Sequence, residues 1–128
     1  METTEHLRTA TRAALLDQRA QLTRVAADLS ADERAFAEAQ DAEGGSFGDN
    51  ADVASDLAEQ QMAGALHHTT DVHLEDVDYA LARLETDAFG VCEDCGERID
   101  PARLRARPTA TRCLNCQQHR EALPLHRR

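Results

Sequence analysis

Four cysteines near the C-terminal end constrain the fold of this chain more than any other feature. They are Cys92, Cys95, Cys113 and Cys116, and their spacing is C-x2-C-x17-C-x2-C. In an intracellular chain this pattern predicts a zinc site, because each C-x-x-C turn offers two sulfurs and zinc takes four ligands in a tetrahedron. Four protein ligands leave no position for water, so we expect one Zn²⁺ with a structural role.

The cysteines have two other interpretations, namely two disulfides or a thioredoxin-type redox pair. A redox C-x-x-C normally opens a helix in a βαβ unit, and no such unit precedes Cys92. Histidines offer weaker alternatives for metal binding: His119 follows Cys116 by three residues, and His67, His68 and His73 lie close together in the sequence. We expect these histidines on a helix surface or in a helix seam rather than on a metal.

The rest of the chain predicts long helices. It has 128 residues, the length of one domain, with 23 alanines, 3% aromatic residues and 30% charged residues. A heptad stripe predicts the first helix, from Thr4 to Ala42, as one continuous element, although Ser30 and Glu33 match a capping box that would favour a break. Its positions are Leu15, Leu22, Leu29 and Phe36, with Gln18, Val25, Asp32 and Ala39 between them.

A glycine-rich stretch, 44–48, predicts a tight loop after this helix. A second helix is expected from about Asn50 to about Asp87. Its apolar stripe is Leu74, Val77, Leu81, Leu84 and Ala88. Neither stripe can be buried alone, so the two helices are predicted to pair as an antiparallel hairpin about 50 Å long.

The predicted fold is therefore mainly α, with two parts. Residues 1–88 form a coiled-coil hairpin with an acidic tip at 43–55. Residues 89–128 form a small four-cysteine finger, with β-turn structure at 92–98 and a short helix from Cys116 to about Leu123. The two helical stripes should face each other, which would place Phe36 and the three leucines before it against the apolar residues 74–84.

Charge and hydropathy exclude several classes of function. No apolar run approaches the ~20 residues needed to span a membrane, and the polar N-terminus does not resemble a secretory signal, so we expect a cytoplasmic protein.

The net charge is −10, from −13 in residues 1–90 and +3 in residues 91–128. This balance argues against direct DNA binding, which needs a broad cationic face. No catalytic triad, phosphate-binding loop or open metal position is present, so an enzyme is not expected.

Several stretches resemble one known family. They are Phe89–Gly96 (FGVCEDCG), Arg103–Leu104, Ala106–Ala110 (ARPTA) and Cys113–Gln117 (CLNCQ). They resemble the entry, the central strand–turn segment and the exit of the zinc finger in the DksA/TraR family of bacterial RNA polymerase-binding factors. Residues Asp49–Ser55 (DNADVAS) resemble the D-x-x-D-x-A tip of that family, between the two predicted helices as in the family.

The resemblance implies a regulator of transcription rather than a catalyst. Such factors insert their coiled coil into the secondary channel of RNA polymerase, so that Asp49, Asp52 and Ala54 would approach the catalytic magnesium and modulate initiation. Helix capping is a structural alternative for the two aspartates. An interaction or stress adaptor that keeps the fold without regulating polymerase is the alternative function.

The finger also contains a cluster of arginines. Arg103 and Arg107 belong to a basic patch with Arg105 and Arg112, which would either contact a partner or form a solvated face. Family members that respond to guanosine tetraphosphate carry basic residues on the second helix near the finger. No Lys or Arg stands between Arg34 and Arg83 here, so we do not expect tight binding of that nucleotide.

Overall fold

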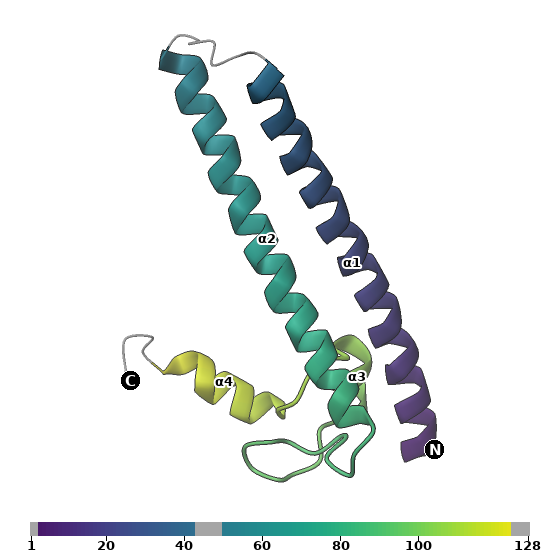
Figure 1. Cartoon of the computed structure of the whole chain (residues 1–128). Coiled ribbons are helices and arrows are strands. Elements are labelled where there is room, and N and C mark those ends of the chain that lie inside the picture. Colours follow the sequence, from purple (N-terminus) through teal and green to yellow (C-terminus); the bar gives the residue numbers. More distant parts are fainter. Residues whose placement is uncertain (1–2, 43–49, 124–128) are drawn as a thin grey trace. The chain divides into compact units, whose positions relative to one another are not determined.

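Helices account for most of the chain (Figure 1). The computed structural model describes residues 3–42 and 50–123. The helices are α1 (Thr4–Ala42), α2 (Asn50–Leu84), α3 (Pro101–Ala106) and α4 (Leu114–Ala122). Two long helices, a four-cysteine finger and a short C-terminal helix confirm the mainly-α fold class. Within the described ranges, no helix combines the length and the apolar character needed to cross a membrane.

The bounds of the long helices follow the sequence closely. Helix α1 passes through Ser30 without a break, as predicted. Helix α2 ends at Leu84 rather than near Asp87, because turns occupy residues 85–90. The guanidinium of Arg8 donates to the carbonyls of Leu84 and Thr86, which satisfies acceptors left unpaired at this helix end. The predicted loop at 44–48 lies outside the described residues.

The chain divides into two compact units. The finger unit contains Met1–Arg19 and Asp76–Arg128, and the hairpin unit contains Ala20–Glu75. In the finger unit the two long helices pair antiparallel through ion pairs, Arg12 with Glu85 at 2.8 Å and Arg19 with Asp78 at 2.7 Å. In the hairpin unit His67 and Glu33 join α2 to α1 in the same antiparallel sense.

The apolar core lies in the finger unit. Every buried hydrophobic side chain among the described residues belongs to this unit: Leu7, Leu15, Val77, Ala80, Leu84, Phe89, Cys92, Ile99 and Leu104. Both long helices and the finger contribute to it, so the finger completes a core that the helix ends begin. In the hairpin unit the seam residues Leu22, Leu29 and Phe36 are only half-buried.

The predicted seam of α1 is partly wrong. Val25 is 46% exposed, and Asp32 and Ala39 are exposed as well. Ala26 is half-buried instead, and Glu33 rather than Asp32 meets α2. On a straight helix with 3.6 residues per turn, a residue four positions after a seam leucine lies about 40° from it around the axis, and a residue three positions after lies about 60° from it. The later position of each pair is therefore closer to the seam. The stripe of α2 is confirmed from Leu74 to Leu84, with Val77 and Leu84 buried and Leu74 and Leu81 half-buried. Ala88 lies beyond the end of the helix, in the turns that follow it.

Candidate metal centre

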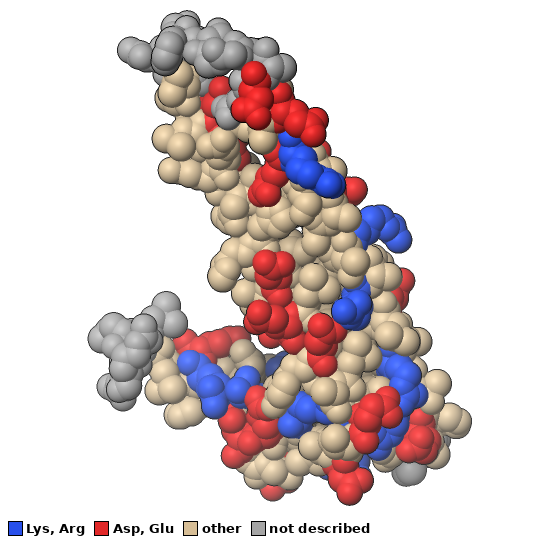
Figure 2. All heavy atoms as spheres, viewed as in Figure 1, with Lys and Arg blue, Asp and Glu red and all other residues tan. Residues whose placement is uncertain are grey.

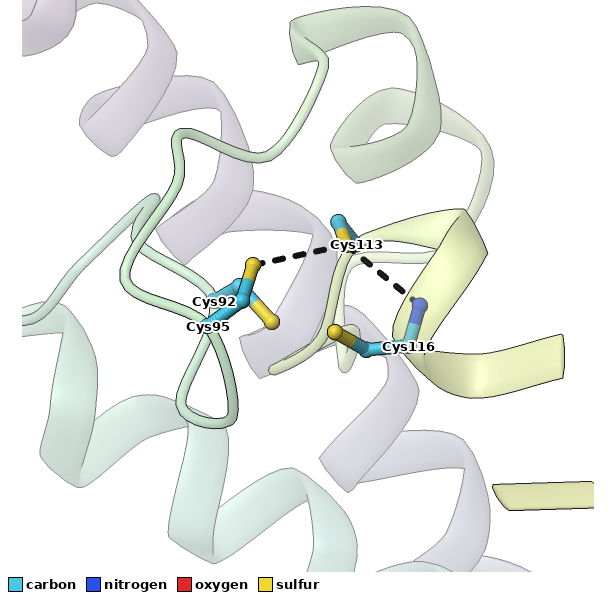
Figure 3. Close-up of side chains that lie close together, drawn as sticks. All are labelled: Cys92, Cys95, Cys113 and Cys116. Atoms are coloured by element: carbon cyan, nitrogen blue, oxygen red, sulfur yellow. Dashed lines mark hydrogen bonds between the residues drawn. The ribbon is translucent and has the colours of Figure 1, made fainter. Parts of the chain in front are cut away.

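The four cysteine sulfurs gather at one point of the finger (Figure 3). All four Sγ atoms lie within 4.8 Å of one another, and those of Cys95 and Cys113 are 3.8 Å apart. Tetrahedral zinc with Zn–S bonds of about 2.3 Å places its sulfurs roughly 3.8 Å apart. The donor set and its spacing therefore fit a closed, four-coordinate Zn²⁺, which confirms the prediction of one structural zinc.

Local backbone structure positions both cysteine pairs. The N–H of Cys92 donates to the carbonyl of Glu97 at 2.8 Å, and the N–H of Gly96 donates back to the carbonyl of Cys92 at 3.0 Å. Gly96 has φ +79°, a left-handed conformation that favours glycine, so this turn depends on it. Cys113 precedes α4 as its N-cap, and its sulfur accepts from the Cys116 N–H at 3.5 Å.

The thiols of the cluster do not ionise equally easily. Burial opposes ionisation of Cys92, but backbone hydrogen bonds at Cys113, Cys95 and Asp94 outweigh it and lower the pKa of this thiol to about 6. Hydrogen bonding to the sulfurs of Cys113 and Cys92 raises the pKa of Cys116 far above its ordinary value. Zinc must therefore displace protons from part of the cluster, so its affinity falls as the pH is lowered.

The middle of the finger differs from the expected strand–turn segment. Residues 101–106 form helix α3, whose N-cap Asp100 accepts from the N–H of Ala102 at 2.9 Å. Pro101 occupies the first turn, where its missing N–H costs nothing, and Leu104 is buried in the core. The Asp-Pro pair is a helix-start signal that could have revealed this element from the sequence.

Glu93, a residue that the sequence did not single out, ties the finger to the end of α2. Its carboxylate accepts from the hydroxyls of Tyr79 at 2.9 Å and Thr111 at 3.1 Å. It also pairs with Arg112 at 2.7 Å, and its side chain is only 20% exposed. Arg83 stacks on the Tyr79 ring and donates to the carbonyl of Val91. These contacts join positions far apart in the sequence, so spacing alone could not indicate them.

We expect Glu93→Ala to lower the free energy of unfolding of the finger unit by about 2 kcal/mol. The change leaves Tyr79, Thr111 and Arg112 without their shared charged acceptor, and hydrogen bonds to charged groups contribute roughly 1.5–3 kcal/mol. Chemical denaturation followed by tyrosine fluorescence measures the loss. Glu97→Ala, which removes an exposed carboxylate from the same finger, is the matched control and should change stability by less than about 0.5 kcal/mol. Equal effects of the two changes would contradict the role given to Glu93.

The arginines of the expected basic patch have different surroundings. Arg112 is engaged by Glu93 and by Asp94 at 3.0 Å, so it acts inside the finger. Hydrogen bonding from Arg120, with added charge from Arg112, lowers the pKa of the Asp94 carboxyl. Arg103 is half-buried and donates from Nε to the carbonyl of Arg112. Arg103 and Arg107 both line an open groove of about 390 Å³ on the finger, where a partner could reach them.

The other predicted site residues are only partly described. Asp49 lies outside the described residues, and so does the side chain of Asp52, although its backbone belongs to α2. Ala54 is an exposed residue of α2. Within the described ranges the four cysteines are the only group of His, Cys, Asp and Glu with metal-binding geometry. His68, His73 and His119 are exposed, and His67 is half-buried in the seam.

Charged side chains are distributed differently over the two parts of the chain. The hairpin unit carries 12 acidic residues against two arginines in its sequence. On the face drawn in Figure 2, acidic side chains lie along the long helices with basic ones among them, and acidic and basic side chains intermix closely around the finger. The mixture around the finger agrees with the ion pairs that Glu93 and Asp94 make there.

Comparison with known proteins finds similarity in both the finger and the long helices. Residues 88–122 match the family model described as the prokaryotic dksA/traR C4-type zinc finger. The solved structure of transcription factor DksA2 from Pseudomonas aeruginosa superposes with a TM-score of 0.71 and 32% sequence identity. That alignment covers 91% of this chain and 84% of DksA2, so it includes the long helices as well as the finger.

Curated relatives match over a shorter segment. The protein from Haemophilus influenzae named RNA polymerase-binding transcription factor DksA is 46% identical over 44 residues, which are 34% of this chain and 30% of that protein. Its namesake from Caulobacter vibrioides is 49% identical over 45 residues, which are 35% of this chain and 32% of that protein. The matched segment thus spans about a third of the length of these relatives.

Proposed function

Because this chain belongs to the DksA/TraR family of four-cysteine zinc-finger proteins, we propose that it is a transcription regulator that binds RNA polymerase. The observation that carries the proposal is the 32% identity to transcription factor DksA2 over 91% of the chain. A likeness confined to the finger would support only a shared zinc module, whereas this one extends along the hairpin. The names of the curated relatives supply the partner, RNA polymerase.

The proposed mode of action uses the hairpin as the element that enters the secondary channel of polymerase, where its tip modulates initiation. Asp49, Asp52 and Ala54 would reach the neighbourhood of the catalytic centre. The charge of the hairpin unit supports this assignment, because a channel with basic lining and a bound magnesium ion attracts acidic groups. Arg103 and Arg107, which line a groove on the finger, are proposed to contact polymerase outside the channel. The protein would act in the bacterial cytoplasm.

We expect the double change Asp49→Asn with Asp52→Asn to abolish the effect on initiation while leaving polymerase affinity within about threefold of the parent. Asn caps a helix nearly as well as Asp, so the change removes charge with a cost of about 1 kcal/mol or less per site. A reconstituted transcription assay on an unstable promoter measures the effect, beside a binding assay and a thermal melt.

The matched control is Asp71→Asn with Glu75→Gln, which removes two exposed charges from α2 away from the tip. This control should regulate like the parent. A folded tip variant that also regulates like the parent would refute the tip mechanism. If the parent itself does not bind polymerase, the regulator proposal fails. The alternative, an adaptor that keeps the fold without regulating polymerase, then replaces it.

A further inference from the structure

An open groove lies between α1 and α2 within the hairpin unit. It has a volume of about 370 Å³ and is lined by Glu33, Phe36, Ala37, Glu59 and Gln60. Its wall combines one aromatic ring with two carboxylate side chains.

Phe36 lines the groove together with α1 residues and with two polar residues of α2. The sequence predicted that Phe36 would pack against the stripe at 74–84, but the structure places it beside Glu59 and Gln60. All described residues from 53 to 62 of α2 are exposed. Phe36 is half-buried, with apolar surface accessible in an acidic environment.

One carboxylate of the groove is already oriented. Glu33 Oε1 lies 3.1 Å from the buried Nε2 of His67, within ion-pair distance, but the two atoms are not aligned as a hydrogen bond. Glu59 is exposed on the facing helix, and no described residue forms an ion pair with it. Neither Arg24 nor Arg34, the two basic residues of this unit, lines the groove. The charge of Glu59 is thus not neutralised by any described residue of this unit.

A guanidinium group suits this groove better than other cations. Its flat face stacks on an aromatic ring, and its edge donates to carboxylates in a fixed fork. A lysine ammonium is a strongly hydrated point charge that lacks both the planar face and the fork. The 12 acidic residues of the unit would also attract a basic partner surface before contact.

We propose that the groove receives an arginine side chain of the protein partner, stacked on Phe36 and paired with Glu59 and Glu33. This inference rests on the proposed function, which makes RNA polymerase the partner. It assigns a contact to residues of the hairpin other than those proposed to act at the tip. The groove would therefore contribute affinity rather than the effect on initiation.

The test measures binding of the full-length chain to core RNA polymerase for four variants. Glu59→Gln and Phe36→Leu should each raise the dissociation constant about three- to tenfold. Phe36→Tyr keeps the ring and should bind like the parent. Glu38→Gln removes an exposed charge of α1 that does not line the groove, so it controls for the general acidic field and should also bind like the parent. A thermal melt checks that each variant is folded.

The outcomes separate this inference from the function on which it rests. If the parent binds polymerase and Glu59→Gln binds equally well, the groove is not a contact, while the proposed function stands. Equal losses for Glu59→Gln and Glu38→Gln would overturn it too, because they would indicate a diffuse charge effect. A loss for Glu59→Gln with none for Phe36→Leu would refute a stacked arginine. If the parent does not bind polymerase, both proposals fail.

Discussion

Removal of zinc is expected to unfold the part of the chain that follows Gly90 and to leave most of the helical signal in place. Structural zinc contributes on the order of 10 kcal/mol to small fingers, more than the stability of the module without it. Among the described residues after that point, the buried apolar side chains are Cys92, Ile99, Leu104 and Pro108, too few to hold the finger without metal. Helices α3 and α4 have six and nine residues, so far-UV circular dichroism should change little.

Tyr79 provides a direct probe of this change. It is the only tyrosine of the chain, no tryptophan is present, and its hydroxyl donates to Glu93 in the finger. Chelation should break this hydrogen bond and change tyrosine fluorescence, and added zinc should restore the signal. A chelator saturated with zinc beforehand is the control. Unchanged fluorescence after complete metal removal, measured by zinc analysis, would show that the finger folds without its metal.

The sequence predicts the metal centre well because its geometry is local. Each C-x-x-C pair is set by a short turn or a helix start, and Gly96 supplies the conformation that the first turn needs. The bounds of α1 were equally accessible, since a long amphipathic pattern defines them. Helix α3 differs from the strand–turn segment that the family resemblance implies, although Asp100 and Pro101 signal a helix start at this point of the sequence.

Long-range features were harder to predict. The seam of α1 includes Ala26 rather than Val25 because, at 3.6 residues per turn, the residue four positions after Leu22 lies closer to the seam than the residue three positions after it. The contacts of Glu93 depend on how the finger meets α2, which no spacing encodes. The same holds for the core, because the pattern alone gives Leu15 and Leu22 equal status whereas only Leu15 is fully buried.

This difference leads to an expected result for two neighbouring leucines. Leu15→Ala should lower the free energy of unfolding by about 3 kcal/mol, because a fully buried leucine loses both its transfer free energy and its packing. Leu16→Ala should cost less than about 1 kcal/mol, since Leu16 is 52% exposed on the same helix turn. Both changes have the same chemistry and the same helix propensity, so their difference isolates burial in the finger unit.

Thermal or urea unfolding of the zinc-loaded protein measures both variants, and Leu15→Ala should lower the midpoint temperature by roughly 10 °C. Leu22→Ala extends the comparison into the hairpin unit and should fall between the two, because Leu22 is half-buried. An equal cost for Leu15 and Leu22 would place a second core in the hairpin unit. The predicted order instead makes the finger unit the part that stabilises the chain, which leaves the exposed side of the hairpin unit available for contact with a partner.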